Sequence, residues 1–249
     1  MLRIVNARIP EDHENEFPPY YRGIKYIGIS WINSYFFCPY QIYLEKVKGV
    51  RGEVTKEMKH GTEAHLNLQI EHEIAVEEVI GIREALELSR EESTGFRFRE
   101  VRVIAKMDRY RRRYQIGGRL DELLILPDRV VVIDDKPNKH VAEEYVEKFY
   151  RGAIMQTYAY ALALKEMYNI DRRLDVEIRD RDTGESIIPA REFTSEHEKI
   201  LIGTLDEMYR ILKGKNVPSI RPSINRCRNC RFKDFCDIYA RFFSGVEEH

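Results

Sequence analysis

The stretch Gly117–Lys136, GGRLDELLILPDRVVVIDDK, constrains the fold of this chain more than any other. Two apolar runs, Leu123–Leu126 and Val130–Ile133, are separated by Pro127-Asp128, a pair typical of a tight turn. The pattern predicts two antiparallel strands. Because the second run is apolar at every position, it is typical of a central strand that is buried on both faces.

Counting outward from this turn places Asp121 opposite Asp134. Directly opposed residues of an antiparallel pair lie on the same face, with Cβ atoms about 4.5–5.5 Å apart, so two carboxylates there repel each other unless a cation lies between them. Because side chains alternate along a strand, Lys136 is expected on the face of Asp134, and Asp135 on the other. A slip of one position would make Asp135 the ligand instead of Asp134.

Two carboxylates and a lysine at the end of a buried strand suit phosphodiester hydrolysis. Carboxylate oxygens bind Mg²⁺ or Mn²⁺, and such an ion polarises the scissile phosphate and lowers the pKa of a bound water. The lysine can orient that water or offset the charge that develops in the transition state. The alternative is a solvated hairpin end with an ordinary surface ion pair, because acids and lysines are common at strand ends.

The composition is that of a soluble globular protein, with 249 residues, 43% of them hydrophobic and 33% charged. The net charge of −1 excludes a global basic field, so nucleic acid would have to bind local patches, of which RYRRR (109–113) and residues 221–233 are the candidates. No apolar run reaches the roughly 18 residues that a membrane span needs, and no signal-peptide pattern opens the chain. We therefore expect a cytoplasmic protein without membrane contact.

Four cysteines occur, Cys38 far from the other three, and CRNCRFKDFC near the C-terminus with Cys227, Cys230 and Cys236. In a cytoplasmic chain of this size they are more typical of metal or cluster ligands than of disulfides. Four thiolates suit either an iron–sulfur cluster or zinc. The three-plus-one pattern favours a cluster, because zinc modules more often carry two C-x-x-C pairs. A cluster would join the two ends of the chain around the core.

Three further candidates lie in predicted helices. His65 follows Gly61 by one helical turn and could give a neutral imidazole to the same metal, although a lone helix histidine is ordinarily a surface or core residue. Gln156 and Tyr160 are four apart and share a helix face. They could overlook the metal site and contact the substrate or Lys136. The alternative is that Tyr160 packs in the core and Gln156 is solvated.

The predicted elements give an α/β fold with a mixed central sheet flanked by helices. A strand that follows the long helix could pair parallel with the strand ending at Asp134, as in a βαβ unit. We divide the chain into an arm (1–29), a helical region (30–95), a core (96–215) and a cysteine-rich segment (216–249). The expected helices are 30–37, 57–92 with a break near Gly81, 142–167 and 195–212, and the expected strands beside the hairpin are 2–5, 96–105, 110–116, 175–179 and 186–193.

Taken together, these motifs resemble the CRISPR-associated RecB-like exonucleases, the fourth Cas family, within the PD-(D/E)XK superfamily. The resemblance implies a restriction-endonuclease-like core and Lys136 as the catalytic lysine. It implies a metal held by His65, Asp121, Asp134 and the main-chain carbonyl of Asp135, with Gln156 and Tyr160 on the substrate side. The motifs that carry it are Cys38-Pro39, Gly61-x-x-x-His65, Gly118-x-x-Asp121, Asp134-x-Lys136, Gln156-x-x-x-Tyr160 and the three-cysteine tail.

The resemblance also implies a [4Fe–4S] cluster on the four cysteines, with zinc or a [2Fe–2S] cluster as less fitting alternatives. It implies exonuclease activity on DNA, chiefly single-stranded, in CRISPR spacer acquisition, with the CRISPR integrase complex as a partner. Pro137 departs from the family pattern, in which a small hydroxyl residue is common after the lysine. A RecB-like repair nuclease outside CRISPR and a nuclease-like scaffold that binds DNA without cutting are the alternatives. The oligomeric state is not readable from these motifs.

Overall fold

The computed structural model describes residues 1–8, 26–109, 112–138 and 140–243, so most of the expected arm and part of the RYRRR patch lie outside the described residues. Within them, a mixed eight-stranded sheet has the order β3-β1-β4-β5-β6-β7-β8, and β2 pairs with β5 beside this path. The strands are β1 Leu2–Ala7, β2 Tyr26–Gly28, β3 Glu78–Ile80, β4 Gly95–Arg109, β5 Arg112–Ile125, β6 Arg129–Lys136, β7 Arg173–Asp180 and β8 Ser186–Glu192.

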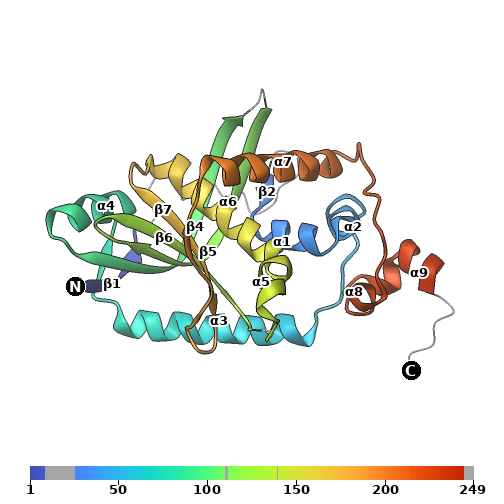
Figure 1. Ribbon diagram of the computed structural model, residues 1–249, viewed down its shortest axis with the longest axis horizontal. Coiled ribbons are helices and arrows are strands. Elements are labelled where there is room, and N and C mark those ends of the chain that lie inside the picture. The colour runs from blue at the N-terminus through green and yellow to red at the C-terminus, as the bar shows by residue number, and fades with distance from the viewer. Residues whose placement is uncertain (9–25, 110–111, 139, 244–249) are drawn as a thin grey trace.

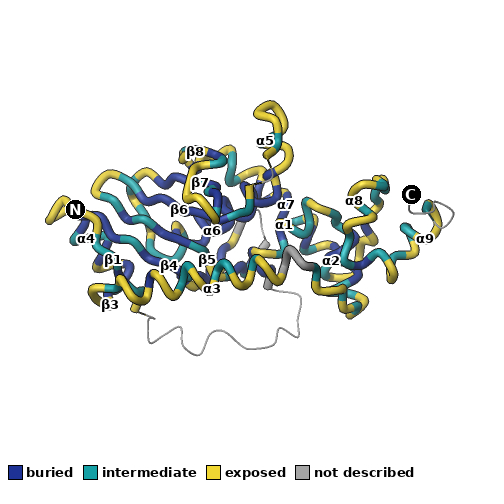
Figure 2. Tube along the Cα trace, turned by 90° about the horizontal axis from the view of Figure 1, so that it is seen from below, coloured by how far each residue is buried: buried dark blue, intermediate teal, exposed yellow. Residues whose placement is uncertain are grey.

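Helices flank this sheet. The helix α6 lies across the sheet and packs on β4 to β7, while α3 runs along the opposite side and contacts β1 and β4 (Figure 1). Figure 2 shows the strands buried over most of their length and α3 exposed along its outer side. The helices are α1 Ser30–Phe37, α2 Pro39–Ile42, the π-helix η2 Tyr43–Val47, α3 Lys56–Ala75, α4 Ile82–Glu91, α5 Glu143–Phe149, α6 Arg151–Tyr168, α7 Ser195–Leu212, α8 Ile224–Arg228, the 3₁₀ turn η3 Lys233–Phe235 and α9 Asp237–Phe243.

The register predicted for the hairpin is confirmed. The Leu126 N–H donates to the carbonyl of Arg129 at 2.8 Å across the turn. The ladder then runs to the pair Glu122↔Ile133, so that the next step brings Asp121 opposite Asp134. The β6 strand is buried from Val130 to Asp135. After α5 and α6 the chain returns as β7, parallel to β6, which confirms the βαβ unit.

Three element boundaries differ from the expectation. The expected strands 110–116 and 117–126 are one strand, β5, which runs through the glycine pair. The expected helix 142–167 is two helices, because Tyr150 turns the chain between α5 and α6 and its hydroxyl donates to the carbonyl of Pro137 at 2.9 Å. The break near Gly81 is confirmed, but the three-residue strand β3 precedes it and pairs parallel with β1.

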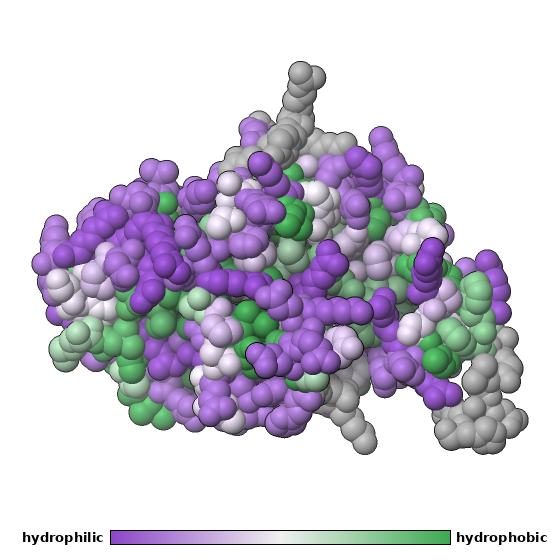
Figure 3. All heavy atoms as spheres, viewed as in Figure 1, coloured by the Kyte–Doolittle hydropathy of each residue, from purple (hydrophilic) through white to green (hydrophobic). Residues whose placement is uncertain are grey.

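The core lies between the sheet and α6, which is buried at every position from Gly152 to Leu164. A helix that is apolar all round is typical of such a buried position. The face seen in Figure 1 is mostly hydrophilic, with hydrophobic side chains in small groups (Figure 3). In the described part of the chain, no helix combines the length and apolar character needed to cross a membrane.

Candidate active site

Asp134 and Lys136 lie together at the end of β6. Asp134 is 1% exposed and points to the side of the sheet that α6 covers, where its Oδ1 accepts a hydrogen bond from Gln156 Nε2 at 3.1 Å. Its Oδ2 lies 2.7 Å from Lys136 Nζ, an ion pair without a well-directed hydrogen bond. The lysine side chain is 18% exposed. Lys136 therefore reaches toward solvent from a buried carboxylate.

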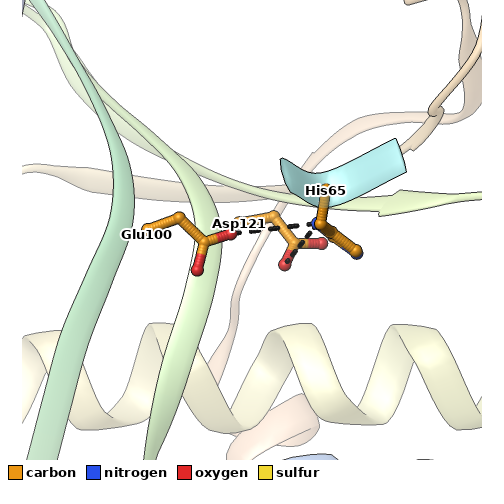
Figure 4. A group of neighbouring side chains, drawn as sticks. All are labelled: His65, Glu100 and Asp121. Atoms are coloured by element: carbon orange, nitrogen blue, oxygen red, sulfur yellow. Dashed lines mark ion pairs between the residues drawn. The ribbon is translucent and has the colours of Figure 1, made fainter. Parts of the chain in front are cut away.

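Asp121 and His65 form the second part of the site. Asp121 Oδ2 accepts a hydrogen bond from the N–H of Asp135 at 2.8 Å, which ties β5 to the end of β6. Asp121 Oδ1 lies 3.9 Å from Nδ1 of His65, which α3 holds above the strands (Figure 4). Among the described residues, the groups close enough to share an ion are His65, Asp121 and a residue absent from the sequence motifs, Glu100.

The Asp135 side chain points to the opposite face of the sheet. Its Oδ2 lies 2.5 Å from Nη2 of Arg99 and its Oδ1 lies 3.2 Å from Nε of Arg179. Both arginines also pair with Glu122, and this ionic network is buried behind the site. The main-chain carbonyl of Asp135 accepts a hydrogen bond from Arg181 Nη2 at 3.3 Å. The register therefore places the Asp134 side chain on the face that carries the site. Of Asp135, only the main chain lies near the site.

Burial and neighbouring charges shift both titratable groups at the end of β6. Burial raises the pKa of Asp134 to about 7, with Asp121 adding to the rise and Lys136 opposing it. Burial acts to lower the pKa of Lys136, but the Asp134 and Asp121 carboxylates outweigh it and the pKa is raised. The lysine is thus held as a cation. Asp134 titrates near neutral pH, as a buried carboxylate does when its charge is only partly compensated.

Tyr160 and Gln156, one helical turn apart on α6, have different surroundings. Gln156 contacts Asp134 directly. The Tyr160 hydroxyl donates to the carbonyl of Arg119 at 2.7 Å, and its ring lies against Gly118, where an added Cβ would be 3.1 Å from the ring. Tyr160 therefore packs against the backbone of β5 at Gly118 and Arg119, close to Asp121 in the strand.

Sequence reasoning missed Glu100, although a signal was present. The apolar side chains of β4 that are at most 2% exposed fall on even numbers up to Phe98 and on odd numbers from Val101 to Met107. At this change of phase Glu100 has a positive φ of 53°, although the register of β4 on β5 is the same on both sides of it. Arg181, whose guanidinium lies near Gly61 of α3, was also missed, because it follows β7 far away in the sequence.

The donors present suit a hard divalent cation. Carboxylate oxygens and one imidazole are ligands that Mn²⁺ and Mg²⁺ accept. The Nδ1 atom of His65 is buried and has no hydrogen-bond partner in the described residues. Asp134 Oδ2 is also buried and accepts no hydrogen bond there, although it forms an ion pair with Lys136. Buried polar atoms are ordinarily satisfied, so these two atoms fit the role of ligands to a divalent ion.

The four cysteines come together from both ends of the chain. Cys38, Cys227, Cys230 and Cys236 line one pocket at the end of the molecule that carries α2, α8 and α9 (Figure 1). All four are free thiols. No three of these sulfurs lie within 4.8 Å of one another, although all four residues are described. Burial raises the pKa of the Cys38 thiol, and Gln41 Nε2 donates to the sulfur of Cys230 at 3.2 Å.

The sequence-family model of the PD-(D/E)XK nuclease superfamily matches residues 74–237 of this chain, which are 164 of its 249 residues. The chain belongs to this superfamily. It is therefore a nuclease of the PD-(D/E)XK type, and the matched region holds the β5–β6 hairpin, α6 and the three C-terminal cysteines. His65 and Cys38 precede the matched region, so the place of His65 beside Asp121 and that of Cys38 in the cysteine pocket come from the tertiary structure and not from the superfamily match.

Two solved structures are similar to this PD-(D/E)XK nuclease. A protein named SSO0001 gives a TM-score of 0.47 at 12% identity, over 89% of this chain and 91% of that one. A protein named "Putative exonuclease" from Eubacterium rectale gives a TM-score of 0.47 at 13% identity, over 97% of this chain and 95% of that one. A comparison with curated proteins found no match.

Proposed function

We propose that this nuclease is a divalent-metal-dependent DNA exonuclease that acts chiefly on single strands. In this proposal His65, Asp121, Asp134 and the carbonyl of Asp135 hold Mg²⁺ or Mn²⁺, and Lys136 is the catalytic lysine. The observation that carries it is the 2.7 Å pair between Asp134 and Lys136 on the strand opposite Asp121. Membership of the PD-(D/E)XK superfamily supports the reaction type.

The ion, when bound, would polarise the scissile phosphate and lower the pKa of a water molecule. Lys136, held cationic by Asp134, donates to the attacking water or to a phosphate oxygen as charge develops there. Gln156 fixes one oxygen of Asp134. The N–H of Asp135 fixes one oxygen of Asp121, which leaves the other turned to His65.

The test compares Lys136→Ala with Lys165→Ala, a matched control at a half-exposed position on α6. End-labelled linear single strands, linear duplexes and closed circular single strands are incubated with Mn²⁺. We expect Lys136→Ala to lose at least about 100-fold in rate and Lys165→Ala to keep the wild-type rate. Linear single strands should be degraded fastest, and circles should survive because an exonuclease needs an end.

Three outcomes would contradict parts of this proposal. Wild-type activity in both Lys136→Ala and Asp134→Ala would remove these residues from the mechanism. Degradation of circles at the rate of linear strands would show an endonuclease. Tight DNA binding without cleavage under Mg²⁺ or Mn²⁺ would favour the scaffold alternative.

We also propose that the four cysteines bind a [4Fe–4S] cluster. A single zinc ion with Zn–S bonds of about 2.3 Å would bring its tetrahedral sulfurs to about 3.8 Å from one another. The wider spread of these sulfurs around a common pocket is more consistent with a larger group. Arg226 and Lys233 also line the pocket and would offset thiolate charge, and the Gln41 amide would stabilise one sulfur.

Anaerobic purification followed by iron, sulfide and zinc analysis tests the cluster. We expect about four irons and four sulfides per chain, with loss of both in Cys230→Ser. One zinc per chain without iron would contradict the cluster and leave the nuclease proposal intact.

A role in CRISPR spacer acquisition, and a cytoplasmic location, rest on the sequence alone. Trimming of DNA ends that are held by a purified CRISPR integrase complex would support that role. Equal trimming of free ends without any effect of the integrase would favour a RecB-like repair nuclease.

A further inference from the structure

We propose that Glu100 is a ligand of the divalent ion, which adds a third carboxylate to the site. This inference rests on the proposed function, because it concerns the same metal centre. Glu100 belongs to β4, outside the hairpin that carries Asp121, Asp134 and Lys136, and no sequence motif includes it.

The geometry brings Glu100 to His65 and Asp121. The neighbouring pairs Arg99↔Glu122 and Val101↔Leu120 place Glu100 opposite Asp121 on adjacent strands. Glu100 Oε1 lies 3.8 Å from Nδ1 of His65, and the same nitrogen lies 3.9 Å from Asp121 Oδ1. Figure 4 shows the three side chains converging between α3 and the two strands. One ligand atom from each lies within 4.8 Å of the other two.

The chemistry of this group points to a bound cation. His65 Nδ1 is buried without a hydrogen-bond partner among the described residues, although two carboxylates face it. Two half-buried carboxylates on adjacent strands repel each other when both are ionised. Arg119 lies 3.5 Å from the other oxygen of Glu100, but its side chain is 48% exposed, so solvent weakens its compensation of the Glu100 charge. The oxygen that faces His65 stays available to an ion.

The backbone explains why this carboxylate reaches the site. On β4 the buried side changes between Phe98 and Val101, and on β5 it changes between Leu123 and Leu120. Glu100 lies at the centre of that change with a positive φ, a conformation that costs a residue other than glycine about 1 kcal/mol or more. The β4–β5 ladder keeps one register on both sides of this change, so Glu100 stays opposite Asp121.

The test is Mn²⁺ binding to the full chain, measured by isothermal titration calorimetry without DNA. Glu100→Gln keeps the size and removes the charge, and we expect it to weaken Mn²⁺ binding by at least about 10-fold. Arg119→Gln is the matched control, since it removes the neighbouring cation and should leave the affinity equal to or tighter than that of the wild type. Asp121→Asn should weaken binding at least as much as Glu100→Gln does.

The outcomes separate this inference from the proposed function. Wild-type affinity in Glu100→Gln beside weak binding in Asp121→Asn would overturn the Glu100 assignment and leave the metal site standing. Absence of Mn²⁺ binding to the wild-type chain would overturn both. Should Glu100→Gln not fold, anomalous diffraction from wild-type crystals with Mn²⁺ decides. A Glu100 oxygen bonded to the ion supports the assignment, and a Glu100 that stays paired with Arg119 alone refutes it.

Discussion

The buried carboxylate of Asp134 should make Mn²⁺ binding depend on pH near neutrality. Its pKa is raised to about 7, chiefly by burial, and a protonated carboxyl group must lose its proton before it binds an ion. At pH 6 about one tenth of such a group is ionised, and at pH 8 about nine tenths. We therefore expect the apparent affinity for Mn²⁺ to fall about 10-fold from pH 8 to pH 6, or about 1.4 kcal/mol. An aspartate of ordinary pKa would show no change over this range.

The same shift affects the stability of the metal-free protein. Because the pKa of Asp134 is higher in the folded state than its ordinary value of 3.8, its proton favours folding at low pH. This contribution is complete below about pH 4 and is lost as the pH rises to about 7, by up to about 4 kcal/mol. Bound Mn²⁺ should restore the stability that is lost when Asp134 ionises. The gain in unfolding temperature on adding Mn²⁺ should therefore be larger at pH 8 than at pH 6.

Calorimetry at pH 6, 7 and 8, in buffers of different ionisation enthalpy, measures both the affinity and the number of protons released. His65 must be separated from Asp134, because a protonated imidazole also rejects metal. The control is therefore the His65→Gln variant. In this variant the affinity for Mn²⁺ should be weaker, but the part of its pH dependence that comes from Asp134 should persist. An affinity that is constant from pH 6 to pH 8 in this variant would refute the argument that burial controls Asp134.

Two stability predictions follow from close packing and buried charge. Arg99→Met should lower the free energy of unfolding by about 3 kcal/mol, because it leaves buried carboxylates with fewer cations. An unchanged urea midpoint would show that Arg97 and Arg179 compensate fully for the lost charge of Arg99. Gly152→Ala should cost about 1–3 kcal/mol, because its Cβ would lie 2.3 Å from Asn33 Oδ1 and 3.2 Å from Asn33 backbone atoms. Gly203→Ala, with no atom within 4 Å of the added Cβ, should be neutral or stabilising by up to about 1 kcal/mol in the same thermal unfolding assay, and equal losses in both would contradict the packing argument.

Local pattern was enough to predict the hairpin and the faces of its acids. A two-residue turn and a period of two leave one register in which the apolar positions of β5 and β6 are buried, and that register places Asp121 opposite Asp134 and Asp135 on the far face. The parallel return of β7 followed from the length of the helical connection. Both inferences depend on residues close in the sequence.

Contacts between distant segments account for the rest. Whether His65 approaches Asp121 depends on how α3 crosses the sheet, and no periodicity within α3 specifies that. Glu100 lies opposite Asp121 through the pairing of β4 with β5, and Tyr150, at the break between α5 and α6, donates to the carbonyl of Pro137. Cys38 meets the other three cysteines in the same way, across almost the whole chain. Spacing along a chain limits which neighbours share a face, but only the packing of complete elements determines which faces meet.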